Sequence, residues 1–349
     1  MRWDNLTIEA DESTRLPGYR DGAVVRRFDA PEALDMRFYE VRAKSALNRV
    51  PEASRMPFRW TVNPYRGCSH ACIFCFARPT HTYLDFDAGR DFEREIVVKV
   101  NAPEVLRAEL RRPSWKGEHV AMGTNTDPYQ WVEGRYRLMP GIWEALRDAR
   151  NPCSVLTKSP LLLRDLPLMR EIAAVTDISA NLSVPTIDER AWRATEPHTP
   201  HPRARLEAVA ELNRNGIPTG VLVAPLMPGI NDDPRQVEQI IETAIAAGAT
   251  SIGGIGLHLR GEVRGVFLEW LAAYRPDLLE HYEELYARGA YLPAHERERL
   301  SGLLQRAGAR RAKPFRRDPA PARSAAQRAD RRAGGRCATA AAAMQDSLF

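Results

Sequence analysis

Three cysteines, Cys68, Cys72 and Cys75, stand within eight residues in a C-x3-C-x2-C spacing. Any disulfide arrangement would leave one of the three thiols unpaired, and so short a loop does not allow two bridges. Thiolates this close together are instead typical ligands of a soft metal. The two realistic choices are an iron–sulfur cluster and zinc.

The number of cysteines favours a cluster with an open position. A four-iron cluster held entirely by protein takes one cysteine for each iron, but Cys153 and Cys337 are far from the loop in sequence. The loop therefore predicts a [4Fe-4S] cluster with three protein ligands, and an open metal position is typical of a catalytic site. The alternative is a zinc site of the three cysteines with His70 or His81, although Cys3His sites usually pair two halves across a longer gap.

The loop also resembles a known family. Its spacing, with the aromatic Phe74 directly before the last cysteine, is similar to the cluster loop of the radical S-adenosylmethionine (radical SAM) enzymes. This resemblance implies that the amino and carboxylate groups of S-adenosylmethionine (SAM) bind the open iron. It also implies that reduction splits SAM into methionine and a 5′-deoxyadenosyl radical, which takes hydrogen from a substrate. A one-electron donor of the flavodoxin or ferredoxin type is then an expected partner.

Composition limits the compartment and the partners. No apolar run is long enough to cross a bilayer, and the first residues lack the pattern of a signal peptide. Few cysteines, three of them in one metal-type group, fit a reducing compartment, so we expect a cytoplasmic protein without a membrane partner. The net charge of +5 arises at the end of the chain, because residues 306–349 carry eleven Lys and Arg against three Asp. The remainder is weakly acidic, which disfavours a basic nucleic-acid-binding body.

Strand-like and helix-like runs alternate after the cysteine loop. Strands are expected at 60–63, 119–123, 153–157, 177–184, 219–225 and 250–257. Helices are expected at 102–112, 140–150, 165–175, 202–215, 233–247 and 262–274. This alternation predicts βαβ units and a mainly parallel sheet of the α/β class, short of the eight units of a complete barrel. The family resemblance implies a partial (β/α)6 barrel of the TIM type, with 96–100 as an extension beside the sheet.

The chain length of 349 residues allows one large domain with terminal extensions. We expect an N-terminal cap, a radical SAM core barrel, a helical extension and a disordered Arg/Ala/Pro-rich tail. These parts are placed at 1–58, 59–275, 276–305 and 306–349.

The end of the tail has a pattern of its own. The last five residues, from Gln345 to Phe349, resemble the Gln-x-x-Leu-Phe peptide with which bacterial DNA-repair and replication proteins bind the sliding clamp. A flexible tether that presents two apolar side chains suits such docking. Its basic residues also make DNA an expected partner through phosphate contacts.

Polar residues at the ends of the predicted strands are the candidate SAM contacts. Thr124 and Asp127 follow the second strand, where Asp127 suits the amino group of SAM, although Thr-Asp-Pro is also turn chemistry. Lys158 follows the third strand and suits the carboxylate of SAM; the alternative is a lysine whose ammonium reaches solvent. Asn181 and Ser183 share one face of the fourth strand and suit the ribose hydroxyls.

A narrower resemblance rests on residues 63–67 (Asn-Pro-Tyr-Arg-Gly), 126–130 (Thr-Asp-Pro-Tyr-Gln) and a Glu-Pro loop at 195–202. These motifs resemble the radical SAM branch related to spore photoproduct lyase, over about residues 38–290. The branch implies a damaged nucleobase in DNA as substrate. The lyase carries a hydrogen-donating cysteine where this chain has Thr124, and a hydroxyl is a much poorer hydrogen-atom donor, so the same photoproduct chemistry is not implied.

Two other functions remain open, and three further residues have expected roles outside the SAM site. The enzyme could modify a peptide or a small molecule, or the chain could be a non-catalytic zinc-bound scaffold recruited by its tail. Arg193 and Arg205 are expected to be solvated at the surface, with substrate phosphate as the other choice. Cys153 is expected to be a small buried hydrophobe.

Overall fold

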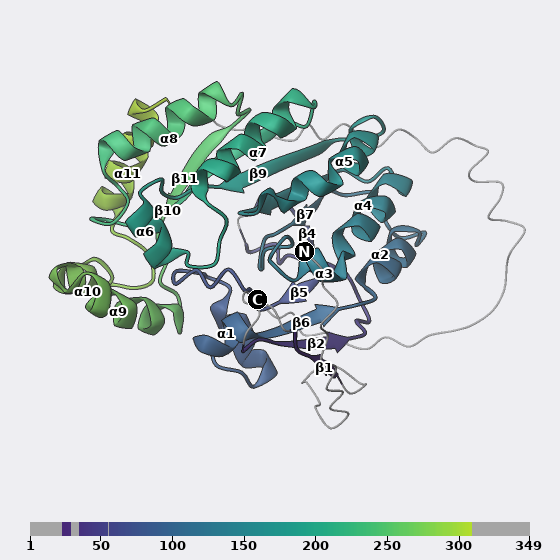
Figure 1. Ribbon diagram of the computed structural model, residues 1–349, viewed down its shortest axis with the longest axis horizontal. Helices are drawn as coiled ribbons and strands as arrows, with labels where there is room; N and C mark the ends of the chain where they lie inside the picture. The colour runs from purple at the N-terminus through teal and green to yellow at the C-terminus, as the bar shows by residue number, and fades with distance from the viewer. Residues whose placement is uncertain (1–22, 29–34, 55, 309–349) are drawn as a thin grey trace, which may run out of the picture.

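The computed structural model of the chain describes residues 23–28, 35–54 and 56–308, which form two sheets with helices packed around them (Figure 1). The strands are β1 (Val24–Arg26), β2 (Arg37–Val41), β3 (Leu47–Arg49), β4 (Trp60–Val62), β5 (Tyr65–Arg66), β6 (Glu95–Lys99), β7 (Val120–Met122), β8 (Cys153–Thr157), β9 (Ile178–Ser183), β10 (Thr219–Leu226) and β11 (Ile252–Gly256). The α-helices are α1 (Arg90–Arg94), α2 (Ala102–Leu110), α3 (Glu133–Tyr136), α4 (Leu138–Asp148), α5 (Leu166–Ala173), α6 (Glu189–Thr195), α7 (Pro202–Arg214), α8 (Pro234–Ala246), α9 (Val263–Tyr274), α10 (Leu279–Leu285) and α11 (Ala294–Arg306). The 3-10 helices are η2 (Arg78–Leu84), η3 (Pro160–Asp165) and η4 (Pro276–Leu278).

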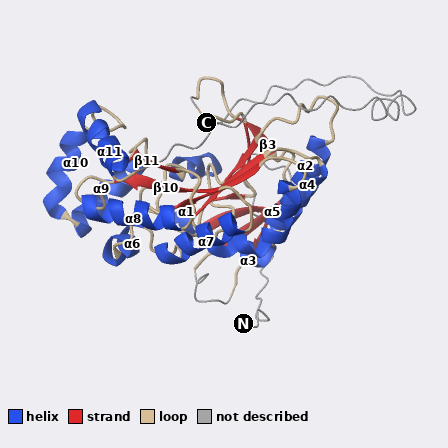
Figure 2. Cartoon of the chain, turned by 90° about the horizontal axis from the view of Figure 1, so that it is seen from above, coloured by secondary structure: helices blue, strands red, loops and turns tan. Residues whose placement is uncertain are grey.

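The larger sheet is the predicted partial barrel. Its order is β11-β10-β9-β8-β7-β4-β3, and within the described residues the six strands from β4 to β11 in this sheet run parallel, whereas β3 pairs antiparallel with β4. Figure 2 shows α5, α7 and α8 along one side of the curved sheet. Helical crossovers between parallel strands give this layered arrangement. The α/β fold class and the six-unit barrel are therefore confirmed.

Alternation of buried and half-buried residues fixes the orientation of β8. In β8, Cys153 and Val155 are almost completely buried in the main core, whereas Ser154 and Leu156 between them are only partly buried. Trp143 of α4 belongs to the same core. Each large aliphatic side chain buried there contributes about 2 kcal/mol. The expectation that Cys153 is a small buried hydrophobe is confirmed.

The second sheet has the order β1-β2-β6-β5. Its central strand β6 is buried along its whole length, pairs parallel with β2 and pairs antiparallel with β5. The segment 96–100 was expected to be an extension beside the main sheet. The structure assigns it to a separate sheet, because β2 from the N-terminal segment pairs with it. After β4 the chain adds β5 to this sheet and then enters the cysteine loop, which therefore lies where the two sheets meet.

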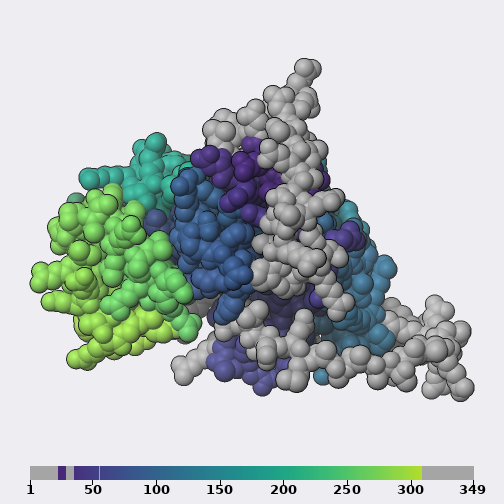
Figure 3. All heavy atoms as spheres, turned by 90° about the horizontal axis from the view of Figure 1, so that it is seen from below, coloured from purple at the N-terminus to yellow at the C-terminus, as the bar shows by residue number. Residues whose placement is uncertain are grey.

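Helices cover the last barrel strand. Residues 276–305 were predicted to be helical, and η4, α10 and α11 lie there, with α11 packed on β11. Figure 3 shows the C-terminal helices, green to yellow, beside the blue segment that follows the cysteines. In the described part of the chain, none of the helices is both long and apolar enough to traverse a bilayer. Of the tail predicted at 306–349, Arg306 still belongs to α11, whereas residues 309–349 with the clamp-like end lie outside the described residues.

Candidate metal and cofactor site

The cysteine loop joins β5 to η2 beside the carboxyl end of β4. Cys68, Cys72 and Cys75 are free thiols; the first two are buried and Cys75 is partly exposed. Burial raises the pKa of Cys75 to about 11 and that of Cys72 well above its usual range. Buried thiols of this kind lose their protons when a bound metal supplies positive charge. The donor set therefore fits a thiolate-ligated metal group.

The backbone of the loop depends on a glycine. Gly67 has φ +76°, and a Cβ atom there would lie 2.9 Å from both the carbonyl oxygen of Phe92 and Cδ1 of Ile96. The next amide, that of Cys68, donates to this same carbonyl of Phe92 at 2.9 Å. Only glycine satisfies both the positive φ and the close approach. This explains the glycine that ends the Asn-Pro-Tyr-Arg-Gly motif.

A buried arginine holds the loop from its other end. Arg78 is completely buried and donates to the carbonyl oxygen of Cys72 from Nε at 3.1 Å and from Nη2 at 2.9 Å. It also donates to the carbonyl oxygens of Ala88 and Gly89, at 3.1 and 2.8 Å. The planar guanidinium can serve several acceptors at once. This role of Arg78 was not predicted from the sequence, in which the only signal is its position three residues after Cys75.

The Thr-Asp-Pro-Tyr-Gln motif braces the same loop. The buried Gln130 accepts from the amide of Ser69 at 2.9 Å and donates to the carbonyl oxygen of Gly67 at 3.1 Å. Thr126 Oγ1 donates to the carbonyl oxygen of Tyr65 at 3.0 Å. Buried backbone groups need such partners. The two motifs therefore occur together because one supports the other.

Asp127 is surrounded by protein donors. Its Oδ1 accepts from the amide of Tyr129 at 2.9 Å and from Thr157 Oγ1 at 2.6 Å. Its Oδ2 accepts from the amide of Lys158 at 2.7 Å and lies 3.4 Å from His70 Nδ1. Although burial raises the pKa of Asp127, His70 and these hydrogen bonds lower it overall. The contact with the SAM amino group stays a prediction, and these four partners favour the turn alternative.

Both histidines proposed for a zinc site have other partners. His81 Nε2 lies 2.8 Å from the carbonyl oxygen of Glu95, and its ring stacks on Phe86 at 5.3 Å. His70 faces Asp127. Within the described ranges, no three His, Cys, Asp or Glu side chains are arranged to hold a single metal ion. A four-iron cluster does not require such an arrangement, because its three thiolates bind three different irons.

The predicted SAM residues lie at or near the carboxyl ends of neighbouring strands, and a contact between Lys158 and Ser183 joins two of them. Thr124 follows β7, Lys158 follows β8, and Asn181 and Ser183 belong to β9, which pairs with β8. Lys158 Nζ donates to Ser183 Oγ at 2.7 Å. The carboxyl ends of parallel strands are where barrels of this kind place their chemistry. Which of these side chains contacts SAM stays a prediction.

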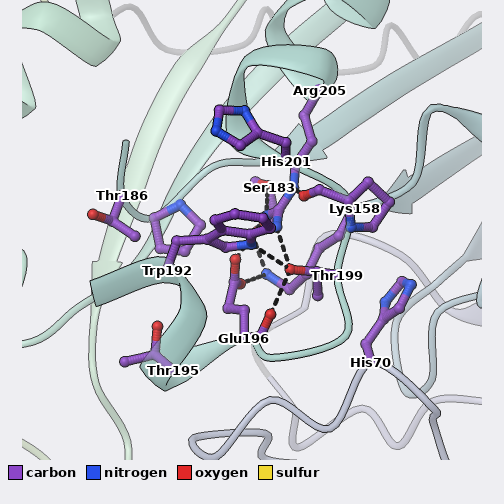
Figure 4. Close-up of polar contacts among 12 residues, drawn as sticks. His70, Lys158, Ser183, Thr186, Trp192, Thr195, Glu196, Thr199, His201 and Arg205 are labelled. Atoms are coloured by element: carbon purple, nitrogen blue, oxygen red, sulfur yellow. Dashed lines mark hydrogen bonds and ion pairs between the residues drawn. The ribbon is translucent and has the colours of Figure 1, made fainter. Parts of the chain in front are cut away.

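A buried carboxylate lies beside these residues (Figure 4). Glu196 is completely buried, with Oε1 2.7 Å from Lys158 Nζ and Oε2 2.8 Å from Arg205 Nη1. Lys158 Nζ also lies 5.6 Å from the centre of the Phe74 ring in the cysteine loop. Burial raises the pKa of Glu196, but the two cations lower it overall. Glu196 is therefore ionised and shared between two cations.

The surface position expected for Arg205 is wrong. This side chain is completely buried and donates to the carbonyl oxygens of Ser183 and Pro200, each at 2.9 Å, and to Thr199 Oγ1. The loop after α6 folds back onto the strand ends, so its carbonyl groups and Glu196 need a donor that only a guanidinium supplies in this number. Arg193 is solvated on the surface, as expected.

A partial parallel barrel with three free thiols on a loop at its strand ends defines the architecture of the radical SAM enzymes. The family model of the radical SAM superfamily matches residues 62–244. The chain belongs to this superfamily and is a radical SAM enzyme whose reaction class is open.

Two relatives are similar to this chain in sequence. An uncharacterised protein of Mycobacterium tuberculosis is 49% identical over 304 residues, which covers 86% of this chain and 89% of the relative. One of Methanocaldococcus jannaschii is 28% identical and covers 58% of this chain and 71% of the relative.

Spore photoproduct lyase with a dinucleoside spore photoproduct matches in structure with a TM-score of 0.57 and 14% identity, over 77% of this chain and 78% of the lyase. A double mutant of the lyase with bound AdoMet and the same dinucleoside gives a TM-score of 0.56 at 14% identity, over 77% of both chains. At this identity the likeness concerns the fold, which is like that of the lyase.

Proposed function

We propose that Cys68, Cys72 and Cys75 hold a [4Fe-4S] cluster and that the enzyme cleaves SAM reductively to start radical chemistry. The observation that carries this proposal is the loop of three free thiols, which is braced on both sides and adjoins the ammonium of Lys158. Held by these three thiolates and reduced, such a cluster would supply the electron for the cleavage of SAM into methionine and a 5′-deoxyadenosyl radical. The side chains around the loop would bind SAM and orient it.

Those side chains have distinct tasks. Lys158 offers an ammonium to the carboxylate of SAM, and a charge-assisted hydrogen bond of this kind is among the strongest in proteins. Thr124, Asn181 and Ser183 offer hydrogen-bonding groups at neighbouring strand ends for the polar groups of SAM. Phe74 of the cysteine loop is buried in the same core as Cys72, and this low-dielectric surrounding strengthens electrostatic interactions at that thiol.

The proposed substrate is a damaged or modified nucleobase in DNA. Support comes from the three branch motifs and from the lyase-like fold, because that lyase was solved with a dinucleoside photoproduct. Thr124 and the burial of Cys153 in the core favour a product radical that is reduced by a route other than a thiol on the second strand. Modification of a peptide or a small molecule is the rival outcome.

The proposed partners and compartment follow from this chemistry. An oxygen-sensitive cluster favours the reducing cytoplasm and a flavodoxin- or ferredoxin-type electron donor. We also propose that the end of the tail, Gln345 to Phe349, binds the sliding clamp. A pull-down with the clamp should lose the enzyme when these five residues are deleted, and equal recovery would remove this partner.

Anaerobic reconstitution tests the core of the proposal. We expect brown protein with about four irons per chain and formation of 5′-deoxyadenosine from SAM after dithionite is added. Bound zinc without iron would contradict it. Deuterated, UV-irradiated DNA then tests the substrate: deuterium in 5′-deoxyadenosine supports a nucleobase. SAM cleavage without such transfer leaves the radical chemistry intact and rejects the DNA assignment.

A further inference from the structure

We propose that Glu196 and Arg205 form a positioning pair, which holds Lys158 where the carboxylate of SAM needs it without cancelling the positive charge of Lys158. This inference rests on the proposed function, since it concerns how the same site recognises SAM. It starts from a difference in burial. The side chains of Glu196 and Arg205 are 0% exposed, whereas that of Lys158 is 15% exposed. Lys158 is therefore the member of the group that a ligand can reach.

The charges of the three groups do not balance. Glu196 carries one negative charge between two cations, so the group has a net charge of +1. If Lys158 were paired with a carboxylate alone, the pair would be neutral and would attract no further anion. Arg205 pairs with Oε2 of Glu196, so the group of three side chains keeps one positive charge in excess. Buried charge of one sign is costly unless it is paired, so a ligand carboxylate at Lys158 would complete a balanced set of two cations and two anions.

The pair is anchored to the strand ends and to the cysteine loop. Arg205 donates to the carbonyl oxygen of Ser183 at the end of β9, while Ser183 Oγ accepts from Lys158. The residue before Glu196, Thr195, accepts at its carbonyl oxygen from the amide of Ile73 at 3.1 Å. Lys158 is thus fixed relative to the thiols on one side and to the strand ends on the other. Such fixing lowers the cost of ordering a long side chain when ligand binds.

A purely structural pair would have a different signature. If Glu196 and Arg205 only anchored the loop after α6, their loss would weaken every ligand of the site to the same degree. If charge alone mattered, removal of the negative charge would raise the net charge to +2 and tighten SAM binding. Positioning of Lys158 predicts a third result, in which only a ligand that has the carboxylate loses affinity.

The test compares SAM with decarboxylated SAM on the anaerobically reconstituted, full-length protein. Dissociation constants are measured by calorimetry for the wild type and for Glu196→Gln. We expect the variant to bind SAM about tenfold more weakly, the equivalent of one charge-assisted hydrogen bond. The affinity for decarboxylated SAM should change less than about twofold. A smaller shift of the electron paramagnetic resonance signal of the reduced cluster on SAM addition should accompany the loss.

Two further variants secure the result. Glu196→Asp keeps the negative charge but moves it back by one methylene group, so this variant should fold even if Glu196→Gln does not. It should also lose affinity for SAM but not for decarboxylated SAM, to a smaller degree than Glu196→Gln. Glu189→Gln on α6 removes the carboxylate of an exposed pair with Arg193 and should bind both ligands like the wild type.

The outcomes separate the two proposals. An equal loss for both ligands, an unchanged affinity for SAM or tighter SAM binding in Glu196→Gln would overturn the positioning role while the proposed function stands. A reconstituted wild type that binds no SAM would overturn both.

Discussion

Two fully buried glutamates adjoin the cysteine loop, and they are satisfied in different ways. Glu133 lies beside the start of the loop and accepts from the hydroxyl of Tyr65. It also accepts from the backbone amides of Leu138 and Met139, at 3.0 and 3.1 Å, and from Arg164 at 2.6 Å. Glu196 lies beside the later part of the loop and faces the ammonium of a lysine and the guanidinium of an arginine.

The difference teaches which of the two serves the fold and which serves the ligand. Glu133 closes the turn into α4 through backbone amides, and burial raises its pKa. Glu196 has a depressed pKa because its cations outweigh burial, and one of these cations is within reach of a ligand. A carboxylate held by backbone amides stabilises structure; one that leaves a reachable cation suits recognition of an anion.

The largest expected effect concerns the loop between the two glutamates. Replacement of any one of Cys68, Cys72 or Cys75 with alanine should abolish the cluster and reduce SAM cleavage to background, because a second iron would lose its protein ligand and two thiolates would have to hold the whole cluster. Iron content and 5′-deoxyadenosine formation measure this. Cys153→Ala is the matched control, since it removes a thiol from the core; it should keep its iron and lose about 1–2 kcal/mol of stability. Full SAM cleavage in any of the three loop variants would show that the replaced cysteine is not a cluster ligand, and the comparison of the two glutamates around this loop would lose its basis.

The next effect concerns Glu133, whose loss should lower stability but not SAM affinity. Glu133→Ala should lower the free energy of unfolding by about 3–5 kcal/mol, because it leaves a partly buried arginine and two amides without their acceptor. Urea unfolding measures this loss. The folded fraction should bind SAM within about twofold of the wild type, since no ligand group is removed. A large, selective loss of SAM affinity in Glu133→Ala would mean that the two glutamates do not differ in role.

Much of the fold could be predicted because it depends on local patterns. The strand predicted at 153–157 coincides with β8, and the other barrel strands differ from the prediction by a few residues at their ends. The second sheet could not be predicted in the same way. Its strands β2 and β6 are separated by the whole cysteine loop, and their pairing is a non-local contact that no periodicity signals.

The residues of the site differ in the same way in how far the sequence predicts them. The cysteines and the strand-end residues, such as Lys158, stand out because their spacing and position are local properties of the chain. Arg78 and Arg205 do not, because arginine is mostly exposed and a pattern assigns it to solvent by default. Both are buried here for one reason: each donates to several backbone carbonyl groups that come from separate segments of the chain.

The contributions of Glu196 and Glu133 to stability should depend on pH in opposite directions. The pKa of Glu196 is lowered from 4.5, so its contribution to stability is present above pH 4.5 and is lost as the pH falls below that value. The pKa of Glu133 is raised from 4.5, so its contribution is present below pH 4.5 and is lost as the pH rises through the raised value. Urea midpoints between about pH 3 and pH 6 should therefore fall less steeply with acid in Glu196→Gln and more steeply in Glu133→Gln. Parallel curves in both variants would remove the electrostatic part of the comparison.

The smallest effect concerns a hydroxyl at the neighbouring strand end. Thr124→Val keeps the shape of the side chain but removes its hydroxyl, so SAM affinity should fall about two- to tenfold, the worth of one neutral hydrogen bond. Thr124→Ser keeps the hydroxyl and should bind SAM like the wild type. Calorimetry with both ligands sharpens the contrast with Glu196: the loss in Thr124→Val should be the same for SAM and decarboxylated SAM, because the hydroxyl is not expected to meet the carboxylate. If Thr124→Val binds both ligands unchanged, Thr124 is not a SAM contact. If it loses SAM alone, carboxylate recognition extends beyond Lys158 to the end of β7.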